Sequence, residues 1–206
     1  MSQRVADFIA ASLSAKGLGD VFMVTGGGAM HLNDAFGRNR ELHVVCLHHE
    51  QACAMAAEAY ARLSGRPAIL NVTTGPGGIN ALNGVFGAYT DSLPMIVISG
   101  QVRRETIAGN FAPGLRQLGD QEVDIVRMVG GITKYAVTVQ DPARIAWELD
   151  KACWLAVSGR PGTVWVDVTI DIQGAYIEPE ALARFEPPPT GGEGLLTGAA
   201  LQAAAR

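Results

Sequence analysis

The stretch AILNVTTGPGGIN, residues 68–80, decides the fold, because it runs from an apolar segment through a glycine-rich turn into a helix start. Residues 68–72 fit a strand that is buried on both faces. Pro76 suits the first position of a helix. Gly77 and Gly78 are poor helix formers, so they weaken a first turn unless something needs the space. The stretch therefore predicts a strand-to-helix crevice, which is where open α/β sheets bind their ligands.

The same order of strand, turn and helix recurs along the chain. Strands are expected over residues 21–24, 43–47, 68–72, 95–99, 135–139 and 163–168. Helices are expected over 5–13, 29–36, 50–63, 76–88, 123–129 and 142–157, and 100–120 is expected to be a loop. Strands with almost no internal alternation imply a parallel sheet that is covered on both faces. The predicted fold is a three-layer α/β/α sandwich with a mainly parallel, roughly six-stranded sheet.

Length and composition fit one soluble α/β domain with a tail. The chain has 206 residues, of which 48% are hydrophobic and 17% charged, and its net charge is −4. It therefore has no electrostatic footprint for nucleic acid, and no apolar run approaches the ~20 residues of a membrane span. The N-terminus lacks the layout of a signal peptide. Three cysteines at unrelated spacing argue against a disulfide framework and favour a reducing cytoplasm.

The composition changes after Asp171. Residues 187–192, PPPTGG, have the composition of a linker, and residues 195–204 are typical of the first turns of another helix. We expect one domain over 1–175, and over 176–206 a linker and the truncated start of a second, central domain. On this hypothesis the chain is a fragment of a longer protein.

A second glycine turn, Gly26-Gly27-Gly28, stands between a predicted strand and a predicted helix. The dinucleotide pattern G-x-G-x-x-G needs a glycine at position 31, where His31 stands, and the chain has no P-loop pattern. Two interpretations stay open. The turn either uses the conformational freedom of glycine, or it is kept small so that a ring can lie against it.

The sequence HHEQ at 48–51 places one carboxylate, Glu50, in the same crevice. Adjacent histidines point apart and lack the spacing of a zinc site, so no metal ligand is assigned. Glu50 either complements the helix dipole or, if buried, shares a proton with a ligand nitrogen. The chain offers no recognisable nucleophile set and no G-x-S-x-G elbow. The pattern therefore favours a cofactor site with a single acid/base group.

Taken together, the ordered motifs resemble the thiamine diphosphate enzymes of the acetolactate synthase-like family, in their N-terminal pyrimidine-binding domain. The resemblance covers roughly residues 3–170. It is carried by VF…GGGA at 21–29, HEQA at 49–52, AEAYAR at 57–62, TGPGGIN at 74–80, AYTDSLP at 88–94, ISGQV at 98–102, QEVDI at 121–125 and SGRPGTVWVD at 158–167.

The resemblance implies a role for each candidate residue. Glu50 takes the place of the family's catalytic glutamate, which would hydrogen-bond the pyrimidine N1′ of the cofactor and promote its imino form. Gln121 matches a glutamine near the substrate, and Arg160 matches a position that contacts FAD in FAD-containing members. Taken singly, Asp91, Gln101, Gln121 and Arg160 are each expected at the surface or as caps. Cofactor contacts are implied for Gly26, Gly27, Gly28, Glu50, Thr74, Gly75, Pro76, Gly77, Asn80 and Gln101.

The resemblance also implies an activity. The parent enzyme would be a lyase or transferase that acts on a 2-keto acid or a related carbonyl compound, as a homodimer or homotetramer assembled through the pyrimidine domain. Mg²⁺ and the diphosphate would be held by a domain with a G-D-G motif, which this chain lacks, so the fragment alone would be inactive. The run VTIDI at 168–172 departs from the family's usual LPKDV, which weakens the case for acetolactate synthesis itself and for FAD. Two alternatives remain: a non-catalytic assembly or regulatory module, and a generic nucleotide-binding domain, which His31 disfavours.

Overall fold

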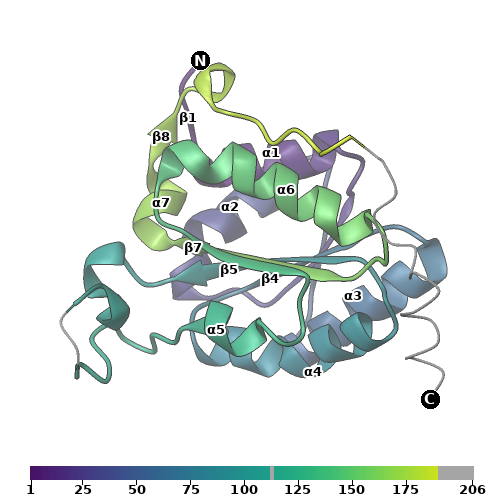
Figure 1. The fold of residues 1–206 in the computed structure, drawn as a ribbon, viewed down its shortest axis with the longest axis horizontal. Coiled ribbons are helices and arrows are strands. Elements are labelled where there is room, and N and C mark those ends of the chain that lie inside the picture. Colours follow the sequence, from purple (N-terminus) through teal and green to yellow (C-terminus); the bar gives the residue numbers. More distant parts are fainter. Residues whose placement is uncertain (112–113, 190–206) are drawn as a thin grey trace.

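A parallel sheet forms the centre of the computed structural model, which describes residues 1–111 and 114–189 (Figure 1). The sheet has six strands in the order β3-β2-β4-β5-β7-β6, and every neighbouring pair is parallel. The strands are β2 (Asp20–Met23), β3 (His43–Cys46), β4 (Ala68–Val72), β5 (Met95–Gln101), β6 (Tyr135–Val139) and β7 (Thr163–Thr169). The predicted three-layer α/β/α sandwich is confirmed.

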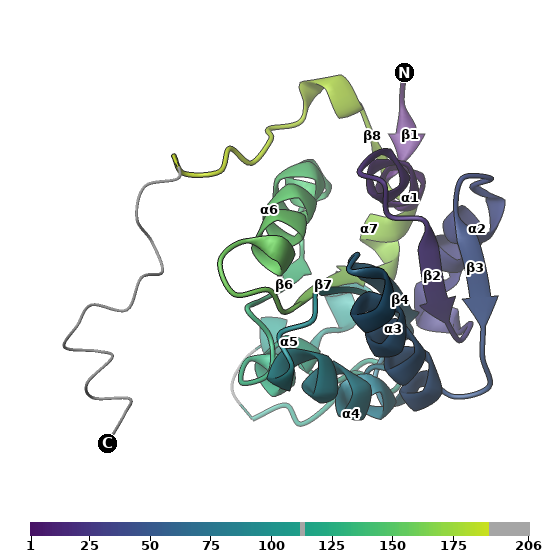
Figure 2. The same cartoon turned by 90° about the vertical axis from the view of Figure 1, so that its right-hand side faces the viewer.

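Helices cover both faces of the sheet, and each face has its own buried cluster (Figures 1 and 2). One layer contains α1 (Val5–Ala15), α2 (Met30–Arg38), α6 (Ile145–Val157) and α7 (Ile170–Gly174). The other contains α3 (Glu50–Ser64), α4 (Pro76–Thr90) and α5 (Ile125–Val129). The predicted apolar stripe of the first helix is buried in the cluster on its own face of the sheet, as amphipathic spacing requires.

The alanine-rich helix α3 packs very closely against α4. A Cβ atom added at Gly84 would lie 2.6 Å from the backbone carbonyl carbon of Ala54. Ala54 and Ala57 are fully buried. Small residues on both helices therefore set the distance between these two elements.

The strand order brings the predicted site turns to one edge of the sheet. From β2 the chain passes through α2 to β3 on one side, and then through α3 to β4 on the other side of β2. Such a reversal of direction opens a crevice at the carboxyl ends of the strands. The turns after β2 and β4 both lie at that edge.

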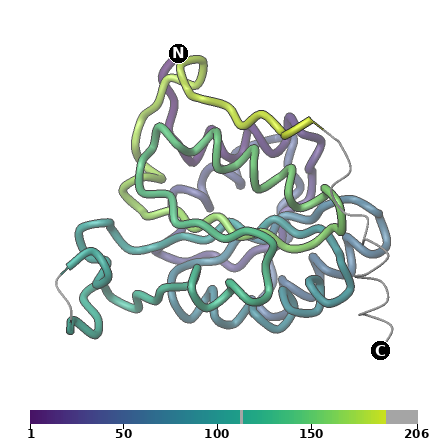
Figure 3. Tube along the Cα trace, viewed as in Figure 1, coloured from purple at the N-terminus to yellow at the C-terminus, as the bar shows by residue number. Residues whose placement is uncertain are grey.

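Short elements complete the domain; the single turn at Pro142–Arg144 falls within the predicted helix 142–157, and the sequence did not predict the others. β1 (Gln3–Arg4) pairs antiparallel with β8 (Tyr176–Ile177), and the tube in Figure 3 shows the two segments side by side. Single-turn helices span Gly27–Ala29, Arg104–Thr106, Ala108–Asn110, Pro142–Arg144 and Pro179–Ala181.

The predicted tail packs onto α6 for part of its length. The ring of Phe185 lies 5.5 Å from that of Trp147 and 5.6 Å from that of Trp154, centroid to centroid. The proposed boundary after residue 175 stays a prediction, and the predicted helix start at 195–204 lies outside the described residues. No helix within the described ranges is long and apolar enough to cross a membrane.

Candidate functional site

The glycines of the 26–28 turn allow neighbouring turns to approach one another. A Cβ atom at Gly26 would lie 2.5 Å from the Thr73 side chain, and one at Gly28 would lie 2.0 Å from Oγ1 of Thr74. Gly26 has φ −162°, and Gly27 and Gly28 also avoid positive φ. Conformational freedom is therefore not the reason for these glycines. Gly27 differs from its neighbours because it is exposed, with no atom within 4 Å of its added Cβ.

The 75–78 turn uses glycine for both conformation and space. Gly75 has φ +57°, and a Cβ atom there would lie 2.0 Å from the carbonyl oxygen of Gln121. A Cβ atom at Gly77 would lie 2.7 Å from Cγ2 of Thr73 and 3.5 Å from Oε1 of Glu50. Pro76 begins α4. The turn thus leaves room beside the Glu50 carboxylate.

Glu50 stands at the start of α3 with one carboxylate oxygen held and the other open. The helix is capped by His49, whose Nδ1 accepts a hydrogen bond from the Gln51 amide at 3.1 Å. Asn80 Nδ2 donates to Glu50 Oε2 at 3.0 Å. Within the described ranges no protein group donates to Oε1, and Glu50 is half-buried. A proton donor on a bound ligand would find an acceptor there.

Thr74 and Gln101 lie beneath the turns with their polar atoms bonded inside the protein. Thr74 Oγ1 donates to the carbonyl of Gly100 at 3.1 Å. Gln101 is 4% exposed, so the expectation that it lies at the surface is wrong. Its Nε2 donates to the Val123 carbonyl at 2.9 Å and to Asp167 Oδ2 at 3.2 Å. Direct contact of these two side chains with a cofactor stays a prediction.

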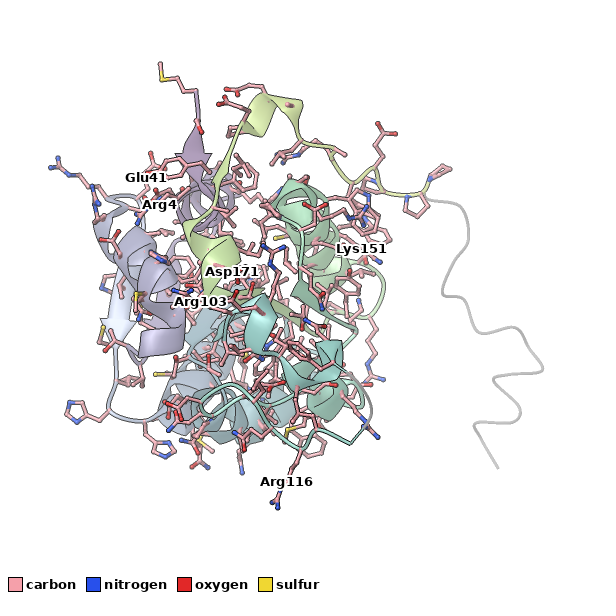
Figure 4. All side chains as sticks on the ribbon, turned by 90° about the vertical axis from the view of Figure 1, so that its left-hand side faces the viewer. Arg4, Glu41, Arg103, Arg116, Lys151 and Asp171 are labelled. Carbon is pink, nitrogen blue, oxygen red and sulfur yellow. The ribbon has the colours of Figure 1, made fainter. Side chains whose placement is uncertain are left out.

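Gln121 is brought to the rim of the same crevice. Its backbone has φ +58°, an unusual value for a residue with a side chain, and its carbonyl lies against Gly75. Gln121 itself is exposed. The segment that carries it, of which the structure describes residues 102–111 and 114–123, is here named the rim loop. Arg116 projects from this loop, away from the body of the domain (Figure 4).

Arg160 lies away from this site. It precedes β7 and therefore stands at the amino edge of the parallel sheet, whereas Glu50 stands at the carboxyl edge. Its Nε donates to Ser92 Oγ at 2.5 Å. Together with Phe86 and Tyr89 it lines a surface hollow of about 370 Å³.

Sequence reasoning missed a buried carboxylate on β7. Asp167 has no exposed surface and accepts hydrogen bonds from Ser99 at 2.5 Å, Gln101 at 3.2 Å and Thr138 at 3.1 Å. Burial raises the pKa of this carboxyl to about 7, although the three hydrogen bonds lower it. The signal was a single charged residue inside the otherwise uncharged strand TVWVDVT.

Within residues 1–111 and 114–189, no group of three or more His, Cys, Asp or Glu side chains is arranged to hold a metal ion. What the carboxyl edge offers is one open carboxylate oxygen, an adjacent amide and two closely packed glycine turns.

Comparison with known proteins shows the family to which the chain belongs. Residues 3–128 match the model of the thiamine pyrophosphate enzyme family, N-terminal TPP binding domain. The chain belongs to this family. Thiamine pyrophosphate is another name for thiamine diphosphate, so the family predicted from the motifs is confirmed.

Several relatives with sequences similar to this chain are acetolactate synthases. The chain is 39% identical over 168 residues to the chloroplastic acetolactate synthase of Arabidopsis thaliana, covering 82% of this chain and 24% of the relative. It is 35% identical over 196 residues to the large subunit of acetolactate synthase isozyme 3 from Escherichia coli K12, covering 92% and 33%. The chain therefore spans about a quarter to a third of the length of these relatives.

Proposed function

We propose that this chain is the pyrimidine-binding part of a thiamine diphosphate-dependent enzyme that acts on a 2-keto acid or a related carbonyl compound. Bound thiamine diphosphate supplies a carbon centre that stabilises a carbanion. The reaction would form or cleave a carbon–carbon bond next to a carbonyl, as lyases and transferases of this kind do. The similarity to acetolactate synthases supports this class of reaction.

In this proposal Glu50 is the catalytic residue. Its open Oε1 would accept a hydrogen bond from the cofactor's pyrimidine ring and exchange a proton with it. Asn80 holds the other oxygen at 3.0 Å and so fixes the direction in which Oε1 points. The missing side chain at Gly77 leaves space for a flat ring beside the carboxylate. The open carboxylate oxygen is the observation that carries the proposal.

The positions of the other predicted contacts support roles for them at the same site. The turns at Gly26–Gly28 and Gly75–Gly77 would border the ring, and Gln121 at the rim would face the substrate. Mg²⁺ and the diphosphate would be held by a domain outside this chain. FAD stays a prediction: the hollow beside Arg160 has aromatic and cationic side chains, but it lies at the other edge of the sheet.

We also propose that the enzyme is a homodimer or homotetramer assembled through this domain. The helices α3 and α4, which carry Glu50 and Asn80, present several large apolar side chains to solvent. Met55 is 43% exposed, Ile79 40% and Phe86 56%. An apolar surface of this kind beside a functional site supports an interface with a second subunit.

Replacing Glu50 by glutamine in the full-length enzyme tests the proposal. Turnover of pyruvate, a simple 2-keto acid, should fall by roughly 10²–10⁴, because that is the usual contribution of positioned proton transfer. Glu58→Gln is the matched control on the same helix, where the carboxylate pairs with Arg62, and it should keep turnover within about tenfold of wild type. Turnover of Glu50→Gln within the same limit would contradict the assigned role.

The competing hypothesis is an assembly or regulatory module that kept the fold without the chemistry. Calorimetry of the full-length protein with thiamine diphosphate and Mg²⁺ separates the two. Saturable binding supports the enzyme, and its absence with intact folding supports the module.

A further inference from the structure

One buried side chain fastens both ends of the rim loop. Gln101 Nε2 donates to the carbonyl of Val123 at 2.9 Å, at the end of the loop. Gln101 Oε1 accepts from the amide of Val102 at 3.0 Å, at its beginning. The Gln101 carboxamide therefore links the two ends of the rim loop, and this pair of hydrogen bonds is named the Gln101 clasp. Both bonds can form only when the amide nitrogen faces Val123.

The orientation of this carboxamide is set by Asp167. The oxygen of Asp167 that faces Gln101, Oδ2, also accepts a hydrogen bond from Thr138, so it acts as an acceptor whether or not Oδ1 carries a proton, and the group that faces it must be a donor. Gln101 Nε2 meets Asp167 Oδ2 at 3.2 Å. Turning the amide over would place its oxygen against both this carboxylate and the Val123 carbonyl. Asp167 thus allows one of the two orientations.

The other donors to Asp167 come from the two neighbouring strands, β5 and β6. Thr138 Oγ1 donates to the same oxygen at 3.1 Å, and Ser99 Oγ donates to Oδ1 at 2.5 Å. The Ser99 oxygen in turn accepts from Trp165 Nε1 at 2.7 Å. Within the described part of the chain no cation pairs with Asp167. Burying a carboxylate that is held only by hydrogen-bond donors costs free energy of folding, so its presence here needs a structural explanation.

The two ends of the rim loop differ in their other attachments. Near the beginning, Arg104 Nε donates to Asp171 on α7 at 2.6 Å, and the Arg104 amide donates to the same carboxylate. Figure 4 shows Asp171 near this end of the loop, beside Arg103. At the far end, the Glu122 carboxylate accepts from the Ala108 amide of the same loop at 2.9 Å, and the Val123 carbonyl also accepts from the Ile125 amide at 2.9 Å. The contact with Gly75 is a backbone approach without a hydrogen bond, so none of these ties the far end to a strand of the sheet. The far end therefore depends more on the Gln101 clasp.

We propose that Asp167 is a positioning residue, which by orienting the Gln101 carboxamide clasps the rim loop and holds Gln121 against Gly75. Its importance for the reaction rests on the proposed function, since that function places Gln121 beside the substrate. The clasp itself does not depend on a cofactor, so it can be tested without one.

Hydrogen exchange of the 206-residue chain, followed by mass spectrometry, tests the clasp. In Asp167→Val two amides should exchange about tenfold faster, because the hydrogen bonds of an unoriented carboxamide are lost: that of Val102, which donates to Gln101 Oε1, and that of Glu122, which donates to Gly119 beside the clasped end. Gln101→Met should give the same local increase while Asp167 is kept. Exchange in β2, which lies away from the network, should stay unchanged and reports whether the domain is intact.

Two further variants separate positioning from mere support of the fold. Asp167→Asn should leave exchange at the Val102 and Glu122 amides within about twofold, because its Oδ1 can still accept from Gln101 while its Nδ2 donates to Ser99. Thr138→Val is the matched control: it removes a hydrogen bond to the same oxygen without touching the loop, so it too should leave the loop unchanged.

Some results would overturn the proposal. Unchanged exchange at the Val102 and Glu122 amides in both Asp167→Val and Gln101→Met would do so, as would an equal increase in Thr138→Val. Glu50→Gln should not affect this measurement, because Glu50 is not in the network. Failure of the proposed function would therefore leave the clasp result standing.

Discussion

Replacing Gly75 by alanine tests whether the rim loop is seated on the 75–78 turn. Gly75 has φ +57° and ψ −113°, and a side chain in such a sparsely populated region costs about 1–3 kcal/mol. The added Cβ atom would also lie 2.0 Å from the carbonyl oxygen of Gln121, which has to move. Forcing an extra carbon into a packed site costs about 1–3 kcal/mol more. The free energy of unfolding should therefore fall by about 2–6 kcal/mol.

Gly65→Ala is the matched control for this change. Gly65 ends α3 with φ +66° and ψ 15°, and no atom lies within 4 Å of its added Cβ. Only the left-handed conformation is penalised there, at about 1–2 kcal/mol. Urea unfolding of both variants gives the two free energies directly. Equal losses would refute the argument, because they would show that the contact with Gln121 contributes nothing.

Two other perturbations follow from close packing and from burial. Gly84→Ala should destabilise the domain by about 1–3 kcal/mol, because its Cβ would meet Ala54 at 2.6 Å. Gly37→Ala should instead stabilise the domain by about 0.5–1 kcal/mol, because Gly37 lies in the open on α2. Thermal unfolding of the two variants shows whether each change in stability has the expected sign. Because the pKa of Asp167 is raised to about 7 in the folded state, that state keeps a proton which the unfolded chain loses near pH 4. Stability from this group is therefore present below about pH 4 and is lost as the pH rises to about 7, on the order of 4 kcal/mol in all. Urea unfolding across this range should show that loss in wild type relative to Asp167→Asn, and parallel curves for the two proteins would contradict it.

The main elements of the fold could be predicted because each has a strong local signal. The strands of the sheet are short apolar runs bounded by turn residues, and the capped helix at Glu50 begins where the sequence indicated. The two-residue strands β1 and β8 carry no such signal, because their pairing joins residues that are far apart in the chain. The helix α7 is only five residues long and has no clear periodicity.

The candidate site was predictable in its residues and less so in its geometry. The glycine turns and Glu50 could be placed at one edge of the sheet from the strand-to-helix pattern alone. The burial of Gln101 could not, because it depends on a hydrogen-bond partner, Asp167, that lies 66 residues away. The reason for the glycines at 26 and 28 also appears only when Thr73 and Thr74 are seen across the turn.

The ladder between β1 and β8 determines how the domain would respond to mechanical force. Gln3 pairs with Ile177 at its outer end and Arg4 with Tyr176 at its inner end, so both chains leave the ladder on the same side. Tension applied at the outer ends of the two strands, Gln3 and Ile177, would break the backbone pairs one after another. The pairs would not all be loaded at once, as they are in shear. The β1–β8 ladder would therefore separate first, and the central sheet with its carboxyl-edge crevice would bear the force only after that separation.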